Sequence, residues 1–419
     1  MATPKLRFKE FDGEWLKVDI QALVDAGIID KPMDGNHGEI HPTSEDYVED
    51  GIPFIMATDV IDGVVHLDKS KKIKMSQADN LRKGFSLEGD ILLTHKATIG
   101  NIAKVPELKT PYIMLTPQVT YYRVLSKNIL SQDFIKSTFE TPIFQNELLA
   151  LCTGATRLYI GISEQRKLPF SYPSKEEQTK IASFLSAVDE KINLLTQKYE
   201  LLSQYKQGMM QKLFSLQMRF KADDGSEFGE WENNKIIEVA DYVDYRGKTP
   251  KKVDEGILLV TAKNIRSGYI DYQVSREYIC LDDFEEVMRR GQAKIGDVLI
   301  TTEAPLGNVA SVDREDIALA QRVIKYRGKE GILNNAFLKQ KFLSEDFQLL
   351  IASKATGGTV KGIKGSTLHN LEIYMPINIK EQTKIANFLT SIDQKIEVVA
   401  QQIEQAKQWK KGLLQQMFV

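Results

Sequence analysis

The sequence predicts an α+β fold in which two similar mixed α/β domains are separated by a pair of long antiparallel coiled-coil helices. The first observation is an internal repeat, because residues 177–214 reappear as residues 381–418, and a repeat decides the architecture before any other feature. The second is heptad spacing in both copies, which is typical of long helices that pack together. The third is a strand-rich segment before each copy, so the chain order is domain, helix, domain, helix.

Length and composition suit two ordinary domains, since the chain has 419 residues of which 42% are apolar. The net charge of −2 excludes a strongly basic surface, so any nucleic-acid binding must come from local patches or from a partner. No apolar run approaches the roughly 18 residues that cross a membrane, and no signal peptide opens the chain. We therefore expect a cytoplasmic protein without membrane contact. The only cysteines, Cys152 and Cys280, exclude a disulfide framework, and we expect both to be buried.

The two predicted domains, residues 1–174 and residues 217–378, repeat each other loosely. IPFIMATDVIDGVVH from Ile52 matches ILLVTAKNIRSGYID from Ile257, and GDILLTHKATIGNIAKV matches GDVLITTEAPLGNVASV. The second pair predicts a turn, a strand, a short loop with Gly100 or Gly307, and another strand. Helical stretches follow at 134–149 and 337–351, then a Gly/Thr-rich loop and a short strand that ends at a proline. Two related domains with different surface residues would read different ligands.

The repeated helices are predicted at residues 175–216 and 379–419. Apolar residues recur there at alternating steps of four and three, which forms a heptad seam. The first seam contains Ile181, Leu185, Val188, Ile192, Leu195, Tyr199 and Leu202, and the second contains Ile385, Leu389, Ile392, Ile396, Val399 and Ile403. A lysine, Lys206 or Lys410, interrupts each seam at the same place. About forty residues at 1.5 Å each give a rod of roughly 60 Å.

The helix starts carry a capping-box pattern, Ser174 with Glu177 and Asn378 with Glu381. Each helix also contains a glycine, Gly208 or Gly412, near its C-terminal end. An interior glycine costs roughly 1 kcal/mol relative to alanine. Either a close approach of another backbone requires it, or the cost is small because the helix end frays.

The most accessible partner for each seam is the other copy in the same chain. The second domain follows the first helix directly, so an antiparallel second helix would return toward the first domain. RFKEFDGEW at Arg7 and RFKADDGSEFGEW at Arg219 support this closure, because the segment that opens the chain also follows the first helix. The chain is therefore pseudo-circular with an approximate two-fold axis. We expect Trp15 and Trp231, which end these opening segments, to be core residues.

The order of two variable domains and two near-identical helices resembles the specificity subunit of Type I restriction–modification systems. The matching pieces are YRGKTP at Tyr245, TTEAPLGN at Thr301, ATGGTVKGIKGSTL at Ala355 and the EQTKIA openings of both helices. The resemblance covers essentially the whole chain. It implies two target recognition domains, each of which reads one half of a bipartite, asymmetric site on double-stranded DNA.

The resemblance also implies that the chain itself performs no chemistry. The paired helices would act as a spacer and dock two methylation subunits, and two restriction–translocation subunits would join later. S-adenosylmethionine, ATP and Mg²⁺ would then be bound by partner subunits only. Two reading heads must meet equivalent grooves about one helical turn apart, roughly 34 Å or a multiple of it, and the predicted rod is long enough for this.

The candidate DNA-contacting residues are polar side chains of loops in both domains, where donors can reach phosphates or base edges. In the first domain they are His37, Ser44, His95, Lys96, Thr98, Thr156, Arg157 and Tyr159. In the second domain they are Arg246, Lys248, Lys251, Lys263, Asn264, Arg266, Thr356, Thr359, Lys361 and Lys364. The alternative for any single member is an ordinary solvated loop residue.

Other motifs do not indicate chemistry. The segment Gly247-Lys248-Thr249 ends like a phosphate-binding loop, but Tyr242 occupies the position of the required upstream glycine. His37 and His41 are four residues apart, yet Gly38 and Pro42 oppose the helix that would direct both toward one metal. No glycine-rich cofactor fingerprint or methyltransferase tetrapeptide is present. Two alternatives remain: a coiled-coil scaffold with two protein-binding domains, and a self-sufficient nuclease or methyltransferase.

Overall fold

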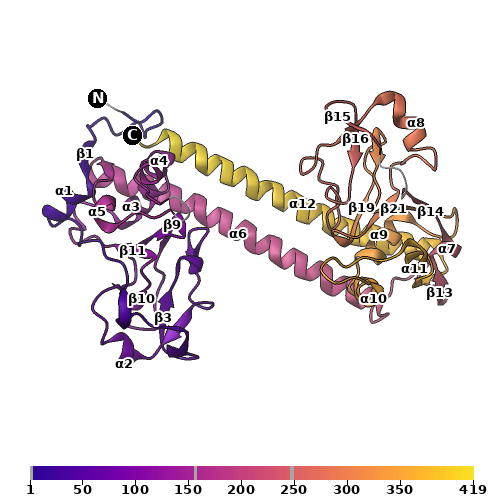
Figure 1. Cartoon of the computed structure of the whole chain (residues 1–419), viewed down its shortest axis with the longest axis horizontal. Coiled ribbons are helices and arrows are strands. Elements are labelled where there is room, and N and C mark those ends of the chain that lie inside the picture. The colour runs from indigo at the N-terminus through magenta and orange to yellow at the C-terminus, as the bar shows by residue number, and fades with distance from the viewer. Residues whose placement is uncertain (1–2, 155–157, 246–249) are drawn as a thin grey trace. The chain divides into compact units, whose positions relative to one another are not determined.

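The computed structural model describes residues 3–154, 158–245 and 250–419 (Figure 1). The chain forms two compact units, the first of residues 1–195 with 402–419 and the second of residues 196–401. This division cuts both long helices, α6 (Lys175–Phe214) and α12 (Ile379–Gln416), which contain 40 and 38 residues. Each unit therefore includes one part of each helix, whereas the domains predicted from the sequence end where a helix begins.

The two helices run antiparallel within each unit. In the first unit, Ile181 and Leu185 near the start of α6 share a core with Leu413 and Phe418 at the end of α12. In the second unit, residues from the end of α6 share a core with residues from the start of α12, and Leu213 is among them. The antiparallel arrangement predicted from the order of domains and helices along the chain is confirmed.

Among its described residues, the first unit contains four small sheets and a set of short helices. Its strands are β1 (Leu16–Asp19), β2 (Tyr47–Val48), β3 (Ile52–Ile55), β4 (Val60–Ile61), β5 (Val64–Val65), β6 (Lys71–Ile73), β7 (Phe85–Ser86), β8 (Ile91–Lys96), β9 (Thr98–Lys104), β10 (Ile113–Leu115), β11 (Val119–Tyr122) and β12 (Pro169–Tyr172). Its short helices are α1 (Ile20–Asp25), η1 (Gly38–Ile40), η2 (Ser44–Asp46), η3 (Ala57–Asp59), α2 (Met75–Ala78), α3 (Gln132–Phe139), α4 (Pro142–Ala150) and α5 (Ile162–Gln165). The strand orders are β11-β8-β9 and β2-β6-β3-β10-β7, with β1 paired to β12 and β4 to β5.

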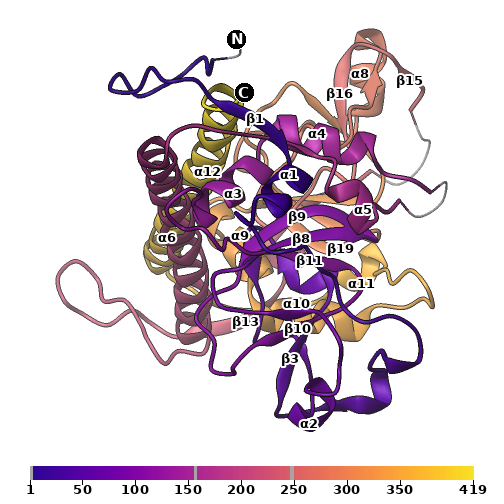
Figure 2. The ribbon, with the colours of Figure 1, turned by 90° about the vertical axis from the view of Figure 1, so that its left-hand side faces the viewer.

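Figures 1 and 2 show the layers of the first unit. Helices α3 and α4 pack against β9, and α3 is joined to α6 by the ion pair of Lys136 and Asp189, while β3 and β10 lie farther from α6. The core between the helices and the first sheet includes Phe134, Phe139 and Tyr122, and each is fully buried. The outer sheet thus projects away from α6, where its loops are accessible to a ligand.

The second unit repeats this plan with fewer strands. Its strands are β13 (Trp231–Lys235), β14 (Ala240–Asp244), β15 (Lys252–Val253), β16 (Ile257–Val260), β17 (Tyr278–Ile279), β18 (Val298–Thr302), β19 (Leu306–Ser311), β20 (Ile317–Leu319), β21 (Val323–Gly328) and β22 (Glu372–Pro376). Its short helices are α7 (Ile236–Val239), η4 (Leu281–Asp283), α8 (Phe284–Val287), α9 (Asn335–Leu343), α10 (Glu345–Lys354) and α11 (Gly365–His369). The sheets have the orders β14-β21-β18-β19 and β15-β17-β16-β20, and β13 pairs with β22.

Two local predictions differ from the structure. The helical stretches predicted at 134–149 and 337–351 are each two helices, because Thr141 and Ser344 break them and the first of these caps α4. Gly100 and Gly307 lie inside β9 and β19, not in the preceding loop. Gly100 has a φ of +90°, and a Cβ there would lie 2.3 Å from Oε1 of Gln145, whose amide nitrogen donates to the Gly100 carbonyl.

The predicted capping boxes form only in part. Ser174 Oγ accepts from Glu177 N at 3.4 Å and Asn378 Oδ1 accepts from Lys380 N at 2.9 Å, so both cap residues are confirmed, but the glutamate side chains have other partners. Glu177 instead accepts two hydrogen bonds of 2.7 Å from Arg7, and Glu381 accepts bonds of 2.8 and 2.9 Å from Arg219. A bidentate arginine is a stronger partner for a buried carboxylate than a single backbone N–H. The opening segments are thereby tied to the helix starts, and Leu6 N donates to Gln416 O at 2.9 Å in the first unit.

The glutamine of each EQTKIA motif is fully buried and bonded at both ends of its amide. Gln178 accepts from Ser131 N at 3.0 Å and donates to Pro173 O at 2.9 Å. Gln382 accepts from Asn334 N and donates to Pro376 O, both at 2.8 Å. The repeated EQ pair therefore joins the helix start to the globular part of its own unit.

The seam residues are buried mainly where the globular part of a unit packs against the two helices. Of the predicted members, Ile181, Leu185, Val188, Ile385, Leu389, Ile392 and Val399 are buried, and Ile192, Leu195, Leu202, Ile396 and Ile403 are partly buried. Tyr199 is 38% exposed, so its assignment to the buried seam is wrong. Most buried members also contact domain residues such as Phe134 or Phe337, which lie in the same cores. Two helices alone do not enclose a side chain as large as Tyr199, and its hydroxyl favours water.

Smaller expectations have mixed outcomes. Trp15 and Trp231 are buried core residues, as predicted. Cys152 and Cys280 are free and only partly buried, not fully buried. An added Cβ at Gly208 or Gly412 would meet no atom within 4 Å, so a close backbone approach does not explain these glycines. Among the described residues, no helix is both long and apolar enough to cross a bilayer.

Candidate nucleic-acid interface

In both units a pair of parallel strands ends at the same edge of its sheet. β3 pairs with β10 in the first unit, and β16 pairs with β20 in the second. Adjacent carboxyl ends of parallel strands leave a crevice where ligands commonly bind. A pocket lies at each of these two edges.

The pocket of the first unit has a volume of about 420 Å³. Met56 and Thr116, the residues that directly follow β3 and β10, are among its lining residues. Its polar walls come from loops and from the end of β8, and they consist of His37, His41, Lys96 and Gln118. The pocket therefore offers two imidazoles, an ammonium and an amide to a ligand.

The pocket of the second unit has a volume of about 220 Å³. Thr261 and Ala320 directly follow β16 and β20, as Met56 and Thr116 follow their strands. Its polar lining consists of Lys252, Lys263, Glu277, Gln321 and Arg322. This pocket is dominated by cations, although Lys252 forms an ion pair of 2.7 Å with Glu277.

The loops after β10 and β20 occupy equivalent places in the two units. LTPQV from Leu115 aligns with LAQRV from Leu319, so Gln118 corresponds to Arg322. The backbone confirms the match, because His95 N donates to Gln118 O and Thr302 N donates to Arg322 O, each at 2.9 Å. The same position of the fold thus carries an amide in one unit and a guanidinium in the other.

The predicted Gly/Thr-rich loops border these pockets. Thr153 and Tyr159 exchange two backbone hydrogen bonds of 2.9 Å, and Ile160 N donates to His95 O at the end of β8. In the second unit, Thr356 pairs with Gly362 in the same way, and Ile363 N donates to Thr302 O. Each loop is therefore anchored to the hairpin that contributes to the pocket.

The structure brings several first-unit candidates together. His37 and Lys96 line the pocket, Thr98 is exposed at the start of β9, and the backbone of exposed Tyr159 bridges to that of Lys96. Ser44 is exposed at the start of η2 and is not part of the pocket lining. Thr156 and Arg157 lie outside the described residues.

His95 does not face solvent, so the prediction that it contacts DNA is wrong. Only 5% of the residue is exposed, and its Nδ1 lies 2.9 Å from Ile160 O. Burial lowers the pKa of this imidazole, which keeps it neutral near pH 7. Residues alternate between the two faces of a strand, so His95 points into the unit while the next residue, Lys96, lines the pocket.

Among second-unit candidates, Lys263 lines the pocket, and Lys251 is exposed between two of its lining residues, Pro250 and Lys252. Thr356, Thr359, Lys361 and Lys364 are all exposed on the loop between α10 and α11. Arg266 is half-buried, with Nε 3.9 Å from a carboxylate oxygen of Asp271. Arg246 and Lys248, together with the rest of the Gly-Lys-Thr segment, lie outside the described residues.

Asn264 is fully buried, so the prediction that it contacts DNA is wrong. Its Oδ1 accepts from Thr261 N and Oγ1, both at 2.9 Å, and its Nδ2 donates to the carbonyls of Asp271 and Ser275. The amide is satisfied by the loop that it closes, as expected for a buried polar side chain. Asn264 shapes the pocket wall that Lys263 belongs to.

Sequence reasoning missed Gln118, Glu303 and Arg322. Nε of Arg322 lies 2.6 Å from Oε1 of Glu303, and the two side chains are 52% and 38% exposed. An alignment of the two halves could have found them, because these positions carry different side chains within otherwise similar segments. None of the three lies in the Gly-rich or Gly/Thr-rich loops that supplied many of the predicted candidates.

His37 is positioned by a buried carboxylate. Its Nε2 lies 2.9 Å from Oδ2 of Asp34, which also forms an ion pair with Lys83. Burial alone would raise the pKa of Asp34, but the contacts with Lys83 and His37 outweigh it and lower the pKa. Asp34 is therefore a carboxylate at neutral pH. His37 and His41 have different partners, since His41 Nδ1 contacts Asn36 O.

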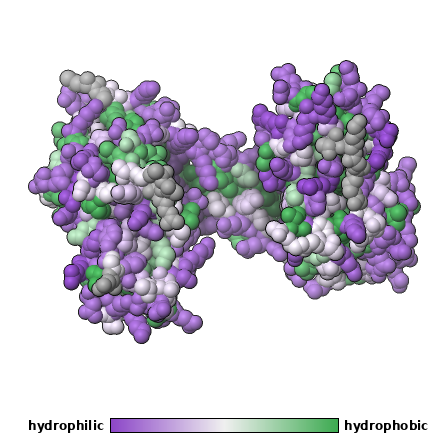
Figure 3. Space-filling model, in the orientation of Figure 1, coloured by the Kyte–Doolittle hydropathy of each residue, from purple (hydrophilic) through white to green (hydrophobic). Residues whose placement is uncertain are grey.

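The exposed faces around these sites are mainly polar. Figure 3 shows hydrophilic residues over most of the visible face of each unit, with scattered hydrophobic ones. Among the described residues, no group of three or more His, Cys, Asp or Glu side chains is arranged to hold a metal ion. The geometry offers hydrogen-bond donors and positive charge to a polar, anionic ligand.

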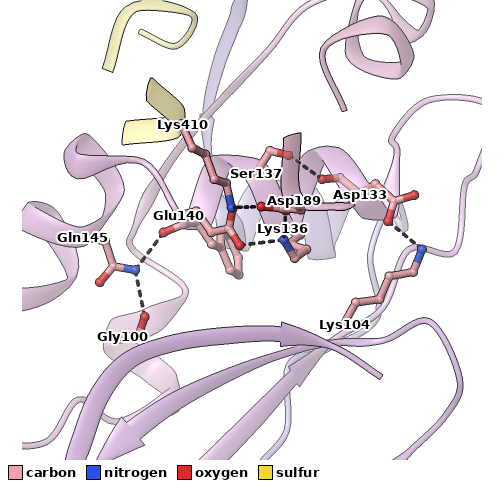
Figure 4. Close-up of polar contacts among 10 residues, drawn as sticks. Gly100, Lys104, Asp133, Lys136, Ser137, Glu140, Gln145, Asp189 and Lys410 are labelled. Carbon is pink, nitrogen blue, oxygen red and sulfur yellow. Dashed lines mark hydrogen bonds and ion pairs between the residues drawn. The ribbon is translucent and has the colours of Figure 1, made fainter. Parts of the chain in front are cut away.

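Ion pairs surround the lysines that interrupt the heptad seam. In the first unit, Lys410 Nζ lies 2.7 Å from Asp189 and 2.6 Å from Glu140 (Figure 4). Lys136 completes a network by contacting both carboxylates. In the second unit, Lys206 lies 2.6 Å from Asp393. Each seam lysine thus pairs with an aspartate of the opposite helix.

Comparison with known proteins gives consistent matches. The family model for the Type I restriction modification DNA specificity domain matches residues 31–204 and residues 229–408. The Type I restriction enzyme MjaVIII specificity subunit of Methanocaldococcus jannaschii is 28% identical over 275 residues, which span 62% of this chain and 63% of that protein. The putative type I restriction enzyme MjaX specificity subunit of the same organism is 26% identical over 385 residues, which span 87% of this chain and 85% of that protein.

Solved structures show the same fold at low sequence identity. The S subunit of a Type I restriction-modification system from M. genitalium has a TM-score of 0.60 at 16% identity, over 100% of this chain and 99% of that one. A chain solved for the assembly and conformational transition of the type I R-M system has a TM-score of 0.54 at 16% identity, over 96% of both chains.

Proposed function

Because the chain belongs to the family of Type I restriction–modification specificity subunits, we propose that it reads a bipartite, asymmetric site on double-stranded DNA, one half-site with each unit. Membership of the family implies DNA-sequence recognition. The division into two unequal half-sites is the finer step, and the two pockets support it.

One observation supports this proposal above the others. The two pockets lie at the same edge of the same pair of parallel strands but present different side chains. Base readout depends on which donors and acceptors meet the base edges. A chain that keeps the scaffold and changes the lining is suited to two different half-sites.

We further propose that catalysis belongs to partners. Two methylation subunits would dock on the paired helices and two restriction–translocation subunits would join them, with S-adenosylmethionine, ATP and Mg²⁺ bound by these subunits. Exposed apolar side chains on the helices support docking, since Leu194, Leu201, Tyr205 and Trp409 are each at least half exposed. With a net charge of −2, much of the phosphate contact would come from the partners.

A domain exchange tests the proposal. Residues 217–378 are replaced with the corresponding domain of another family member, and the DNA of cells that express the complex is profiled for methylation. We expect one half of the methylated sequence to change and the other half to stay the same. The reciprocal exchange of residues 1–174 is the matched control and should change only the other half.

A change in both halves, or in neither, would contradict the two-reader model. An unchanged methylated sequence together with retained partner binding would favour the first of the two alternatives, a coiled-coil scaffold with two protein-binding domains.

A further inference from the structure

Arg322 has an unusual backbone conformation at the edge of the second pocket. Its φ of +73° lies in the left-handed region, which is sterically unfavourable for a non-glycine residue. Such strain persists only where the surroundings impose it, and it concentrates at ligand-contacting sites. The neighbouring strand holds the residue in place, because Thr302 N donates to the Arg322 carbonyl at 2.9 Å.

Glu303 orients the side chain of Arg322 but occupies only one of its nitrogens. Glu303 accepts from Nε at 2.6 Å, and the backbone of Glu303 is itself bridged to Gly362. A guanidinium has five N–H groups, of which Nε carries one. The contact with Glu303 therefore leaves the two terminal nitrogens, with four N–H groups, available in a half-exposed side chain.

The charge around Arg322 selects an acceptor-rich ligand. Lys263 lines the same pocket, and it adds a second cation. Guanine presents two acceptors, N7 and O6, in the major groove, and a bidentate arginine is their commonest partner. Adenine presents one acceptor and one donor there, which an amide side chain matches.

We propose that this loop position reads a base in each unit, with Arg322 selecting guanine and Gln118 selecting adenine. The proposal rests on the proposed function and adds the residue and the base. Gln118 sits at the equivalent place, and its Oε1 lies 3.4 Å from Ala57 N. That long contact leaves the amide nitrogen and one oxygen lone pair for a base.

The test is a binding selection from duplexes with randomised half-site positions, carried out with the complex of this chain and its methylation subunits. Arg322→Gly removes the side chain and suits the left-handed backbone, so the fold is retained. We expect the preference for guanine at one position to fall about tenfold or more, while all other positions stay unchanged. Arg322→Gln should shift that position toward adenine, and Gln118→Arg should shift one position of the other half-site toward guanine.

Arg314→Ala is the matched control, because Arg314 is an exposed arginine of the same unit at the opposite end of β20. It should leave every position unchanged. A uniform loss of affinity across all sequences in Arg322→Gly would identify a phosphate contact and overturn the proposal. Full retention of every guanine preference would overturn it too.

The two hypotheses fail in different ways. If the unaltered complex selects no bipartite site, the proposed function is wrong. If it selects a bipartite site and the Arg322 variants select the same one, only the assignment of this loop position is wrong.

Discussion

The ammonium nitrogen of Lys410 lies 2.7 Å from a carboxylate oxygen of Asp189, across the two antiparallel helices of the first unit. A polar residue in a coiled-coil seam fixes the register at some cost in stability. The two units differ in the surroundings of this pair. Glu140 adds a second carboxylate in the first unit, whereas Leu343 occupies the equivalent place in the second.

The difference predicts unequal effects of the same substitution. Lys410→Met leaves Lys136 alone with two carboxylates, and we expect a loss of about 1–3 kcal/mol in the free energy of unfolding. Lys206→Met should cost less, because half-buried Lys339 still faces Asp393. Urea unfolding of both variants measures the difference. Equal losses would show that Glu140 and Lys339 do not matter.

Acid should weaken the first unit through Asp189. Burial alone would raise the pKa of Asp189, but Lys136 and Lys410 together lower it. A carboxylate whose folded pKa is below its unfolded value, near 3.9, contributes stability above that value and loses it as the pH falls through the folded pKa. We therefore expect the melting temperature to drop between about pH 5 and pH 2.

Asp189→Asn removes this titration, so its melting temperature should depend less steeply on pH over that range. Asp50→Asn replaces an exposed carboxylate and serves as the control. Identical pH profiles for Asp189→Asn and the unaltered chain would contradict the assignment.

The two helix glycines should be replaceable. An alanine at Gly208 or Gly412 meets no atom within 4 Å, and a helix-interior alanine is favoured by roughly 0.5–1 kcal/mol. Each substitution should raise the free energy of unfolding by about that amount. Gly100→Ala is the contrast, since its φ of +90° and the nearby Gln145 oxygen predict a loss. If alanine at position 208 or 412 lowered the free energy of unfolding, the contacts described here would not account for the glycine.

Neighbouring residues at the second pocket should separate binding from stability. Lys263→Ala should weaken DNA binding with little change in melting temperature, because the side chain is exposed. Asn264→Ala leaves its loop partners without the buried amide, which costs about 1–3 kcal/mol. Salt-dependent binding and thermal unfolding of both variants distinguish the roles. If Asn264→Ala weakened DNA binding without lowering the melting temperature, Asn264 would be a DNA-contacting residue after all.

The large elements could be predicted because repetition and heptad spacing depend on many residues at once. The antiparallel helices follow from ten or so seam positions and from the order of domains, and no single side chain decides them. The paired strands followed from two loosely matching segments for the same reason.

Individual side chains could not be placed with the same success. His95 and Lys96 are adjacent residues that can both carry a positive charge. Side chains alternate between the two faces of a strand, so His95 is buried and Lys96 is exposed. Glu177 matched a local capping pattern, but its partner, Arg7, is distant in sequence. Gln118 and Arg322 carry no local signal, since their significance depends on the end of a parallel strand pair formed by distant segments.

The first unit closes with residues 402–419, among them Leu413 and Phe418 in its core. The first unit is therefore the first to be synthesised, but it can complete its fold only after residues 402–419 have been made. At about 5–20 residues per second, the seam of α6 waits roughly 10–40 s for its partner helix. The second unit is contiguous and can fold as it emerges. During that interval the nascent chain exposes the apolar stripe of α6 that Leu413 and Phe418 later cover.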